Sequence, residues 1–439
     1  MTLLSPERAG IRDATGIPGP EGLPPRARFL VVASTVVMVV GMLLGMKITG
    51  RFAASNVAQL LGTAMLLGAF PRLLRVKDVA LLALGVVSVA LAAVSVSMRY
   101  GHTVLVFHSA YFFVAAIYVT AIYRACRDHA ATPAFQEGIR RALPVCLVVL
   151  LGAYTIEIVQ GARYPALGFD DKSHGSLAAV FLAFASLRFL RGRGRFLLAL
   201  AFVGLALVTP SRLPYLLVPF FAVALLVEYR AVRRQAREPW QVYLTHVLLL
   251  VVVTVPALVI ARSSALFRSG FDRVVDPEDI TQASTQSHLD LLRAGLDLKV
   301  ESLWNVVLGV TPGGFAGTLA ASDVDLSGYR LPINDIVAGT APMHSSIGSI
   351  VVEFPLWVAA LYVVVLVASF VALLRRRERG FCLFLVGFTA ATSFYSTHNE
   401  VLFVVALATS LSLAYGRDTG FAPEDAPVQG RAVSSSPRS

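Results

Sequence analysis

The sequence predicts an all-α membrane protein: a polytopic bundle of about 12 transmembrane helices with one large segment outside the membrane. Of its 439 residues, 56% are hydrophobic and only 15% are charged, and the mean hydropathy is +0.70. The apolar residues occur in continuous runs of about 16 to 25 residues, which favours membrane-spanning helices over the alternating strands of a barrel. Lysines and arginines gather in the segments between the runs.

The expected spans follow one another with short connections, except before the tenth. The first apolar run begins at Phe29, after a polar segment, so we expect it to remain as a signal anchor. Gly41 and Gly45 are spaced for close helix packing. The twelve spans cover roughly residues 29–46, 53–70, 79–97, 104–123, 142–160, 175–190, 196–209, 213–228, 243–261, 348–374, 381–395 and 401–415.

The distribution of positive charge predicts the orientation of the chain. If the N-terminus is cytoplasmic, 26 of the 38 lysines and arginines lie in inner segments, and no short outer loop holds more than two. This is the asymmetry that the positive-inside rule describes, so we expect both termini in the cytoplasm. Because the charges are scattered between apolar runs, the net charge of +11 does not indicate a nucleic-acid partner.

This topology divides the chain into five parts. Two polar tails, which we expect to be disordered, flank two groups of spans, and one large outer segment separates those groups. In order, the parts are the N-terminal tail 1–28, spans one to nine in 29–261, the outer segment 262–347, spans ten to twelve in 348–415, and the C-terminal tail 416–439.

The outer segment is too long for a simple connection and contains the pattern of an amphipathic helix. Ser287 and Asp290 have the spacing of a helix cap, and we expect the helix to end near Gly309. Such a helix would lie on the membrane or against the bundle. The apolar positions that recur at helical spacing are Leu289, Leu292, Leu296, Val300 and Leu303.

The stretch from Ala341 to Pro355 holds the first candidate residues. His344 is expected at the outer surface, where a neutral imidazole accepts a proton from a hydroxyl nucleophile; the alternative is an ordinary interfacial histidine. Glu353 is expected about two turns inside the tenth span. A carboxyl group at that depth indicates either a function or a structural pair with an arginine.

Arginines expected on the outer side are the second group of candidates: Arg212 at the outer end of the seventh span, Arg293 on the amphipathic helix, and Arg330 before the His344 segment. Arg212, Arg293 and Arg330 carry guanidinium groups suited to binding two phosphate oxygens, although headgroup or solvent contact is the alternative. In a short outer loop, Asp170 and His174 are candidates for contact with an acceptor or are ordinary loop residues.

Metal and cofactor sites have little support in the sequence. Asp323 and Asp325 have the spacing of a metal-binding pair, but two carboxylates in an acidic loop are weak support. The histidines show no metal-ligand spacing, and no phosphate-binding glycine loop occurs. We therefore expect neither a metal nor a cofactor.

Four local motifs resemble the O-antigen ligase and O-antigen polymerase family of bacterial membrane proteins. His344 and Glu353 match the family's histidine motif in spacing, while Ser345 replaces its usual Asn and Pro355 its usual Gly. The other similar segments, which together with this one cover roughly residues 160–370, are Thr209–Arg212, Arg293 with the Gly-rich Leu308–Phe315, and Gly168–Ala178, where His174 or Ser176 stands near the family's Asn.

The resemblance implies a metal-independent glycosyltransferase of the C class. Such an enzyme passes a glycan from a polyprenyl (undecaprenyl) diphosphate to a free hydroxyl of a glycan or lipid acceptor, at the outer face of the bacterial inner membrane, in the biosynthesis of lipopolysaccharide or another surface polysaccharide. Carried over residue by residue, His344 would activate the acceptor hydroxyl. Arg212, Arg293 and Arg330 would hold the diphosphate, and Glu353, Ser345, His174 and Asp170 would support the site.

Several alternatives stay open at the level of sequence. Polymerase and ligase differ only in what supplies the hydroxyl. A transporter or flippase of lipid-linked oligosaccharides would also need many spans, but transporters often contain inverted repeats and ionisable groups near the midplane. Here the polar candidates gather at the outer ends of spans. A structural subunit of an envelope complex is the third possibility.

Overall fold

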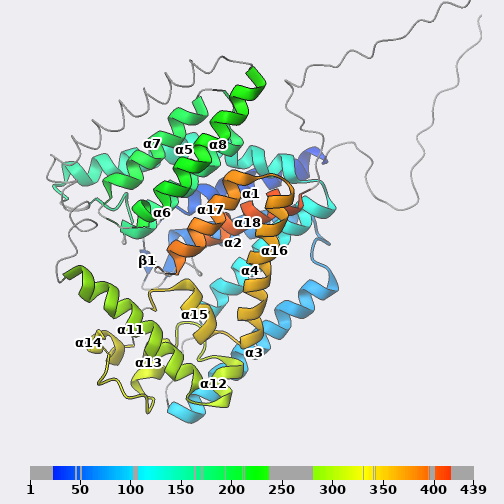
Figure 1. Cartoon of the computed structure of the whole chain (residues 1–439). Helices are drawn as coiled ribbons and strands as arrows, with labels where there is room; N and C mark the ends of the chain where they lie inside the picture. The colour runs from blue at the N-terminus through cyan, green and yellow to red at the C-terminus, as the bar shows by residue number, and fades with distance from the viewer. Residues whose placement is uncertain are drawn as a thin grey trace, which may run out of the picture.

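The computed structural model shows an all-α architecture, with one short antiparallel pair of strands in the described part of the chain (Figure 1). Four described helices contain stretches long and apolar enough to cross a membrane: Val76–Tyr100, Thr132–Val159, Leu213–Arg230 and Leu356–Arg375. The structure describes residues 23–416 apart from 45–46, 50–51, 102–106, 163–164, 170–171, 193, 210, 212, 237–279, 330, 340, 342, 394 and 396–400.

Each expected span within the described residues overlaps one helix of a bundle, except the tenth, which overlaps two helices. The ninth expected span, 243–261, lies outside the described residues. The strands β1 (Lys47–Thr49) and β2 (Phe52–Ala53) pair between the first two helices. The bundle helices are α1 (Pro25–Gly41), α2 (Ala54–Ala69), α3 (Val76–Tyr100), α4 (Phe107–Asp128), α5 (Thr132–Val159), α6 (Lys172–Phe189), α7 (Gly194–Val208), α8 (Leu213–Ala236), α16 (Leu356–Arg375), α17 (Arg379–Thr392) and α18 (Val401–Tyr415).

Small residues allow the bundle helices to approach closely. A Cβ at Gly41 of α1 would lie 2.2 Å from the Cβ of Ala58 in α2, which confirms the close packing expected at that glycine; Gly45 lies outside the described residues. A Cβ at Gly138 of α5 would lie 2.5 Å from the Cβ of Thr35 in α1. The bundle core therefore rests on contact between helix backbones as well as on large apolar side chains.

The arginine-bearing ends of several helices meet on one side of the bundle. Arginine contacts join these ends across different elements: Arg188 with the Glu378 carboxylate at 2.6 Å, Arg140 with the carbonyl oxygen of Phe189 at 3.0 Å, and Arg376 with the carbonyl oxygen of Leu413 at 3.4 Å. These contacts bring together the arginine-bearing start of α5, the end of α6 and the turn between α16 and α17.

The outer subdomain, defined as helices α11 to α15, forms a separate layer below the bundle in Figure 1. It has its own apolar core, in which Val96 of α3 packs with residues such as Leu291, Phe315 and Met343. The last turns of α3 therefore anchor this subdomain. Its helices are α11 (Ile280–Val300), α12 (Leu303–Leu308), α13 (Phe315–Ala320), α14 (Ile333–Val337) and α15 (Ser346–Glu353).

Two expectations for the outer helix are wrong. Ser287 lies inside α11 and does not cap it, and the helix ends at Val300, after which Ser302 caps α12 by accepting the N–H of Asn305 at 3.1 Å. The expected apolar face is also mostly exposed, whereas Leu291, Ala294 and Leu298 are buried. Both sets recur at helical spacing, and hydrophobicity alone does not distinguish a core-facing set from an outward-facing one.

The expected tenth span is two helices instead of one. Pro355 lies two residues after the end of α15; it has no N–H to donate, and it disfavours a helical conformation at the residue before it. Phe354 is accordingly extended, with φ −100° and ψ 160°, and α16 begins at Leu356. Glu353 consequently lies at the end of a short helix of the outer subdomain, outside the apolar helix that follows.

Candidate functional site

Glu353 is the last residue of α15, and its buried side chain accepts two backbone hydrogen bonds. Its Oε1 accepts the backbone N–H groups of Gly313 at 3.1 Å and Phe315 at 3.3 Å, and the side chain is almost fully buried. Burial raises the pKa of Glu353 from its ordinary 4.5 to about 7, and the two N–H groups oppose that shift. The carboxyl group therefore ties the end of α15 to the turn before α13.

Gly309 packs directly against the backbone of Glu353. Its φ of 81° and ψ of 179° form a conformation that is essentially restricted to glycine, and a Cβ there would lie 2.4 Å from the carbonyl oxygen of Glu353. The glycine-rich segment 308–315 and the segment holding His344 and Glu353 thus pack directly together. Two of the four segments on which the family resemblance rests are neighbours in the fold.

One face of α11 packs along the segment from His344 to Phe354. The residues on this face are His288, Leu292, Gly295 and Lys299, spaced four, three and four positions apart. A Cβ at Gly295 would lie 2.4 Å from Cε of Met343. Lys299 is buried, donates from Nζ to the carbonyl oxygen of Phe354 at 3.1 Å, and has its pKa lowered by burial to about 8.

His344 stacks on His288, with ring centroids 4.3 Å apart and ring planes 16° from parallel. His344 is partly exposed and immediately precedes the start of α15. Sequence reasoning missed His288 because it was treated as an isolated histidine, 56 positions from His344. The sequence pattern that indicates His288 is its helical spacing from Leu292 and Gly295, which places these three residues on one face of α11.

Ser345 has a structural role at the start of α15. Its Oγ accepts the N–H of Gly348 at 2.9 Å and so caps the helix. Ser346 donates from Oγ to the carbonyl oxygen of Tyr395 at 3.1 Å, after the end of α17. These two contacts fix the backbone at Ser345 and Ser346, directly after His344.

The structure separates His344 from two of its expected partners. Glu353 lies at the opposite end of α15, about 12 Å away along the helix axis. Arg293 is exposed, pairs with Asp290 at 3.5 Å, and projects about 140° around α11 from His288. Within the described residues, the immediate neighbour of His344 is therefore a second imidazole, and the arginine lies on another face of the helix.

Of the remaining candidates, His174 lies in the first turn of α6. Ser211 donates from Oγ to the Oγ of Ser173 at 3.3 Å, which joins the other two segments of the resemblance. His174 stacks on Phe169, with ring centroids 4.5 Å apart. Arg212, Arg330 and Asp170 lie outside the described residues.

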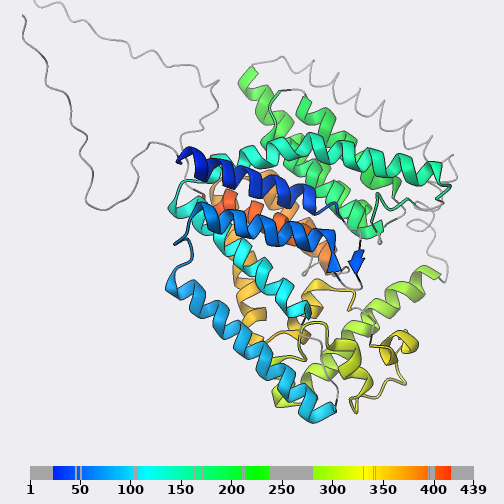
Figure 2. The same ribbon diagram turned by 180° about the vertical axis from the view of Figure 1, so that it is seen from behind.

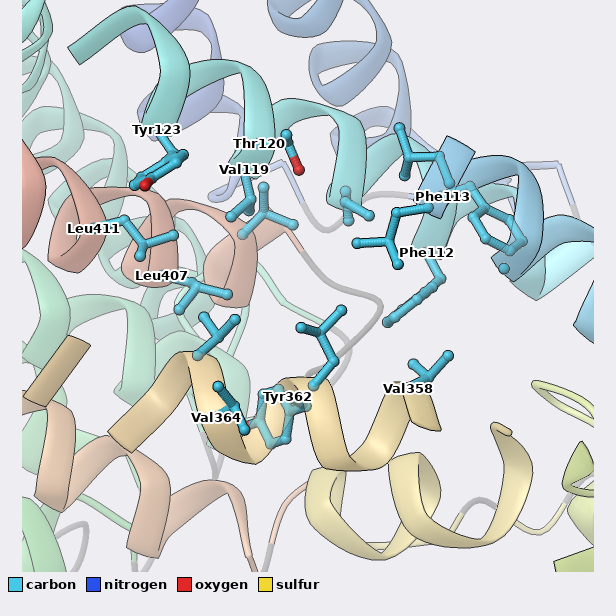
Figure 3. Close-up of a pocket in the computed structure, with 18 of the residues that line it drawn as sticks. Phe112, Phe113, Val119, Thr120, Tyr123, Val358, Tyr362, Val364, Leu407 and Leu411 are labelled. Atoms are coloured by element: carbon cyan, nitrogen blue, oxygen red, sulfur yellow. The ribbon is translucent and has the colours of Figure 1, made fainter. Parts of the chain in front are cut away.

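A cleft of about 440 Å³ opens between α3, α4, α16 and α18, with a mainly apolar lining that also includes Asp78, Thr120 and Tyr123 (Figure 3). Its residues on α4 extend from Phe112 to Tyr123, eleven positions that span about 16 Å. Leu81 of α3 and Val364 of α16 line it and are themselves exposed, so it opens towards the apolar outer faces of both helices. Ile350 of α15 belongs to the lining.

The cleft and His344 are linked through α15. Phe112, which lines the cleft, packs on Phe354 with ring centroids 4.2 Å apart. Ile350 belongs to α15, which begins two residues after His344. One wall of the cleft is therefore the helix that directly follows the His344 segment.

No protein-family model matches the chain, and no curated protein matches it significantly. Among the described residues, no group of three or more His, Cys, Asp or Glu side chains is arranged to hold a metal ion.

Proposed function

We propose that this protein transfers a glycan from a polyprenyl diphosphate to a hydroxyl acceptor at the outer face of the bacterial inner membrane. In this proposal the chain crosses the membrane twelve times, with both termini in the cytoplasm. The observation that carries the proposal is the apolar cleft, because it offers space for a hydrocarbon chain and its lining includes Ile350 of α15, the helix that begins two residues after His344. Its volume lies within the range of ordinary ligand sites.

His344 acts as the general base in this reaction. It takes the proton of the acceptor hydroxyl while the acceptor oxygen forms a bond to the anomeric carbon of the donor sugar. The bond from that carbon to the diphosphate breaks, and the diphosphate leaves on the lipid carrier. Stacking on His288 holds the His344 ring in one orientation. Arg212, Arg293 and Arg330 are retained as the cations that stabilise the charge developing on the diphosphate.

The proposal covers both a polymerase and a ligase. In a polymerase, the hydroxyl belongs to a second lipid-linked repeat unit, and in a ligase it belongs to a finished lipid acceptor. Deletion of the gene distinguishes the two: loss of a polymerase leaves single repeats on the acceptor, and loss of a ligase leaves long chains on the carrier.

The test is complementation of that deletion strain with His344→Ala. We expect loss of surface glycan, reflecting a fall of about 10²-fold to 10⁴-fold in transfer. The matched control is His129→Ala, because His129 also stacks on an aromatic ring, that of Phe70, but near the arginine-bearing side. Membrane levels of both variants are measured by immunoblot. Normal glycan with His344→Ala would refute the catalytic assignment.

The same strain tests the transporter alternative. If deletion leaves lipid-linked glycan trapped on the cytoplasmic side, as judged by its protection from an externally added glycosidase, the protein is a transporter and the proposal fails. Accumulation on the outer side supports transfer.

A further inference from the structure

The outer subdomain exposes large apolar side chains at the end of α11 and on α12. We define the α12 surface as Val300 at the end of α11 with Leu303, Trp304 and Val307 of α12. Three of these side chains are more than half exposed: Val300 at 69%, Leu303 at 76% and Trp304 at 57%. An exposed patch of large apolar side chains is costly in water and marks contact with an apolar partner.

The one polar side chain of α12 is turned inward. Asn305 is buried and donates from Nδ2 to the hydroxyl of Tyr100 at 2.8 Å and to the carbonyl oxygen of Leu298 at 2.8 Å. The Tyr100 hydroxyl donates to Glu301 at 2.7 Å. The helix thus buries its polar side chain while Leu303, Trp304 and Val307 are exposed, which is the reverse of a water-facing helix.

The position of α12 indicates what covers this surface. Trp357, at the start of α16, donates to Ser88 Oγ at 3.3 Å, twelve positions before the end of α3 at Tyr100. Ser88 therefore lies about 18 Å along α3 from Tyr100. The helix α12 packs against both α3 and α16 and therefore occupies the space beside the last turns of α3, next to the start of α16 (Figures 1 and 2).

The two candidate membrane spans that α12 contacts also carry exposed apolar side chains. Met98 and Val94 in the last turns of α3 are exposed, as is Leu356 at the start of α16. If the last turns of α3 lie at the membrane boundary, α12 lies at that boundary as well, because Asn305 donates to the hydroxyl of Tyr100. Tryptophan is enriched at this boundary because its ring is apolar and its N–H is polar.

We propose that α12 is an interfacial helix whose Leu303, Trp304 and Val307 side chains insert into the outer boundary of the lipid bilayer. The partner is the lipid surface itself, at the level where headgroups meet acyl chains. This contact holds the outer subdomain against the membrane and fixes the height of α11, and with it the His288 and His344 pair, above the bilayer. The proposal stands independently of the transfer reaction.

Spin labels test this placement. Leu303→Cys and Val307→Cys variants are labelled with a nitroxide in nanodiscs of phosphatidylethanolamine and phosphatidylglycerol; Cys126, Cys146 and Cys382 are buried, and the unsubstituted protein supplies the background. Label collision with oxygen is compared with collision with a water-soluble nickel chelate. Val94→Cys is the lipid reference, and Ser327→Cys, in an exposed polar loop, is the aqueous reference.

We expect an oxygen-to-nickel collision ratio at positions 303 and 307 that is several-fold above that at position 327 and approaches that at position 94. A ratio equal to that of Ser327→Cys would place α12 in water and overturn the proposal. Exclusion of both reagents, with strong spin coupling between copies, would show that a second copy of the chain covers the surface, and would overturn it as well.

Discussion

The bundle and the outer subdomain differ in whether they bury charged side chains. Nearly the whole of α18 is buried, and its core neighbours are alanine, leucine and phenylalanine. The outer subdomain has an apolar core too, but it also buries Lys299 and Glu353 while exposing Leu303 and Trp304. The comparison teaches that hydrogen bonds of buried charged groups help to hold the outer subdomain together, and the proposed lipid contact would cover its outward apolar face.

Gly309→Ala should have the largest effect and be confined to the outer subdomain. The new Cβ meets the Glu353 backbone at 2.4 Å, in a conformation that costs a residue other than glycine about 1 to 3 kcal/mol before the clash is counted. We expect faster proteolysis within residues 280–353 than in the unsubstituted protein. Gly328→Ala, where a Cβ meets nothing within 4 Å, is the matched control. Equal protease resistance of both variants would contradict the tight packing at Gly309.

Glu353→Ala should have the next largest effect. Its removal leaves the N–H groups of Gly313 and Phe315 buried without their acceptor, at a cost of about 1 to 3 kcal/mol each. Glu353→Gln retains an acceptor oxygen and should recover most of the loss. Thermal unfolding in nanodiscs measures both variants. If glutamine is as damaging as alanine, the hydrogen bonds are not what makes Glu353 stabilising.

Gly41→Ala tests helix packing in the bundle, the other of the two regions compared. The added methyl group overlaps Ala58 and should force α1 and α2 apart, at about 1 to 3 kcal/mol. We expect a lower melting temperature with no increase in proteolysis of the outer subdomain. Gly68→Ala in α2, which has open space for a Cβ, serves as the control. Selective digestion of residues 280–353 in Gly41→Ala would show that the two regions are not separable.

The pH dependence of stability should show the smallest of the four effects. The raised pKa of Glu353 means that its contribution is full below pH 4.5 and is lost as the pH rises through about 7. The lowered pKa of Lys299 works in the opposite direction, and stability rises between pH 8 and 10.5. Between pH 5 and 7.5 we expect a melting temperature that falls by a few degrees more than in Glu353→Gln. Parallel curves would exclude Glu353 as the titrating group.

The sequence predicted the positions of the bundle helices well, because long apolar runs mark helices regardless of which face they bury. In α11 the apolar pattern did not indicate which side faces the protein core, because Leu298 is buried and Leu296 is exposed. Contact of the Leu296 face with the membrane stays a prediction. The sequence also did not indicate the pairing of His344 with His288, which depends on a contact 56 positions apart. Pro355 was a visible helix breaker in the sequence, and it explains why the expected tenth span starts only at Leu356.

The candidate site was predictable only in part. The spacing of His344 and Glu353 indicated one functional unit, but the structure assigns them to opposite ends of α15. Glu353 accepts backbone N–H groups from a segment 40 positions earlier. That contact depends on the turn geometry at Gly309 and Gly313, which no local pattern in the sequence reveals.

The most direct test of the central claim is transfer activity after the cleft is filled while His344 is unchanged. Ala116→Trp places an indole in the cleft wall, and Val87→Trp places the same group on an exposed face of α3 outside it. Each variant is expressed in the deletion strain at equal membrane levels, and surface glycan is measured. The account predicts loss of surface glycan with Ala116→Trp and normal glycan with Val87→Trp. Normal glycan with Ala116→Trp would contradict the claim that the cleft holds the lipid of the donor.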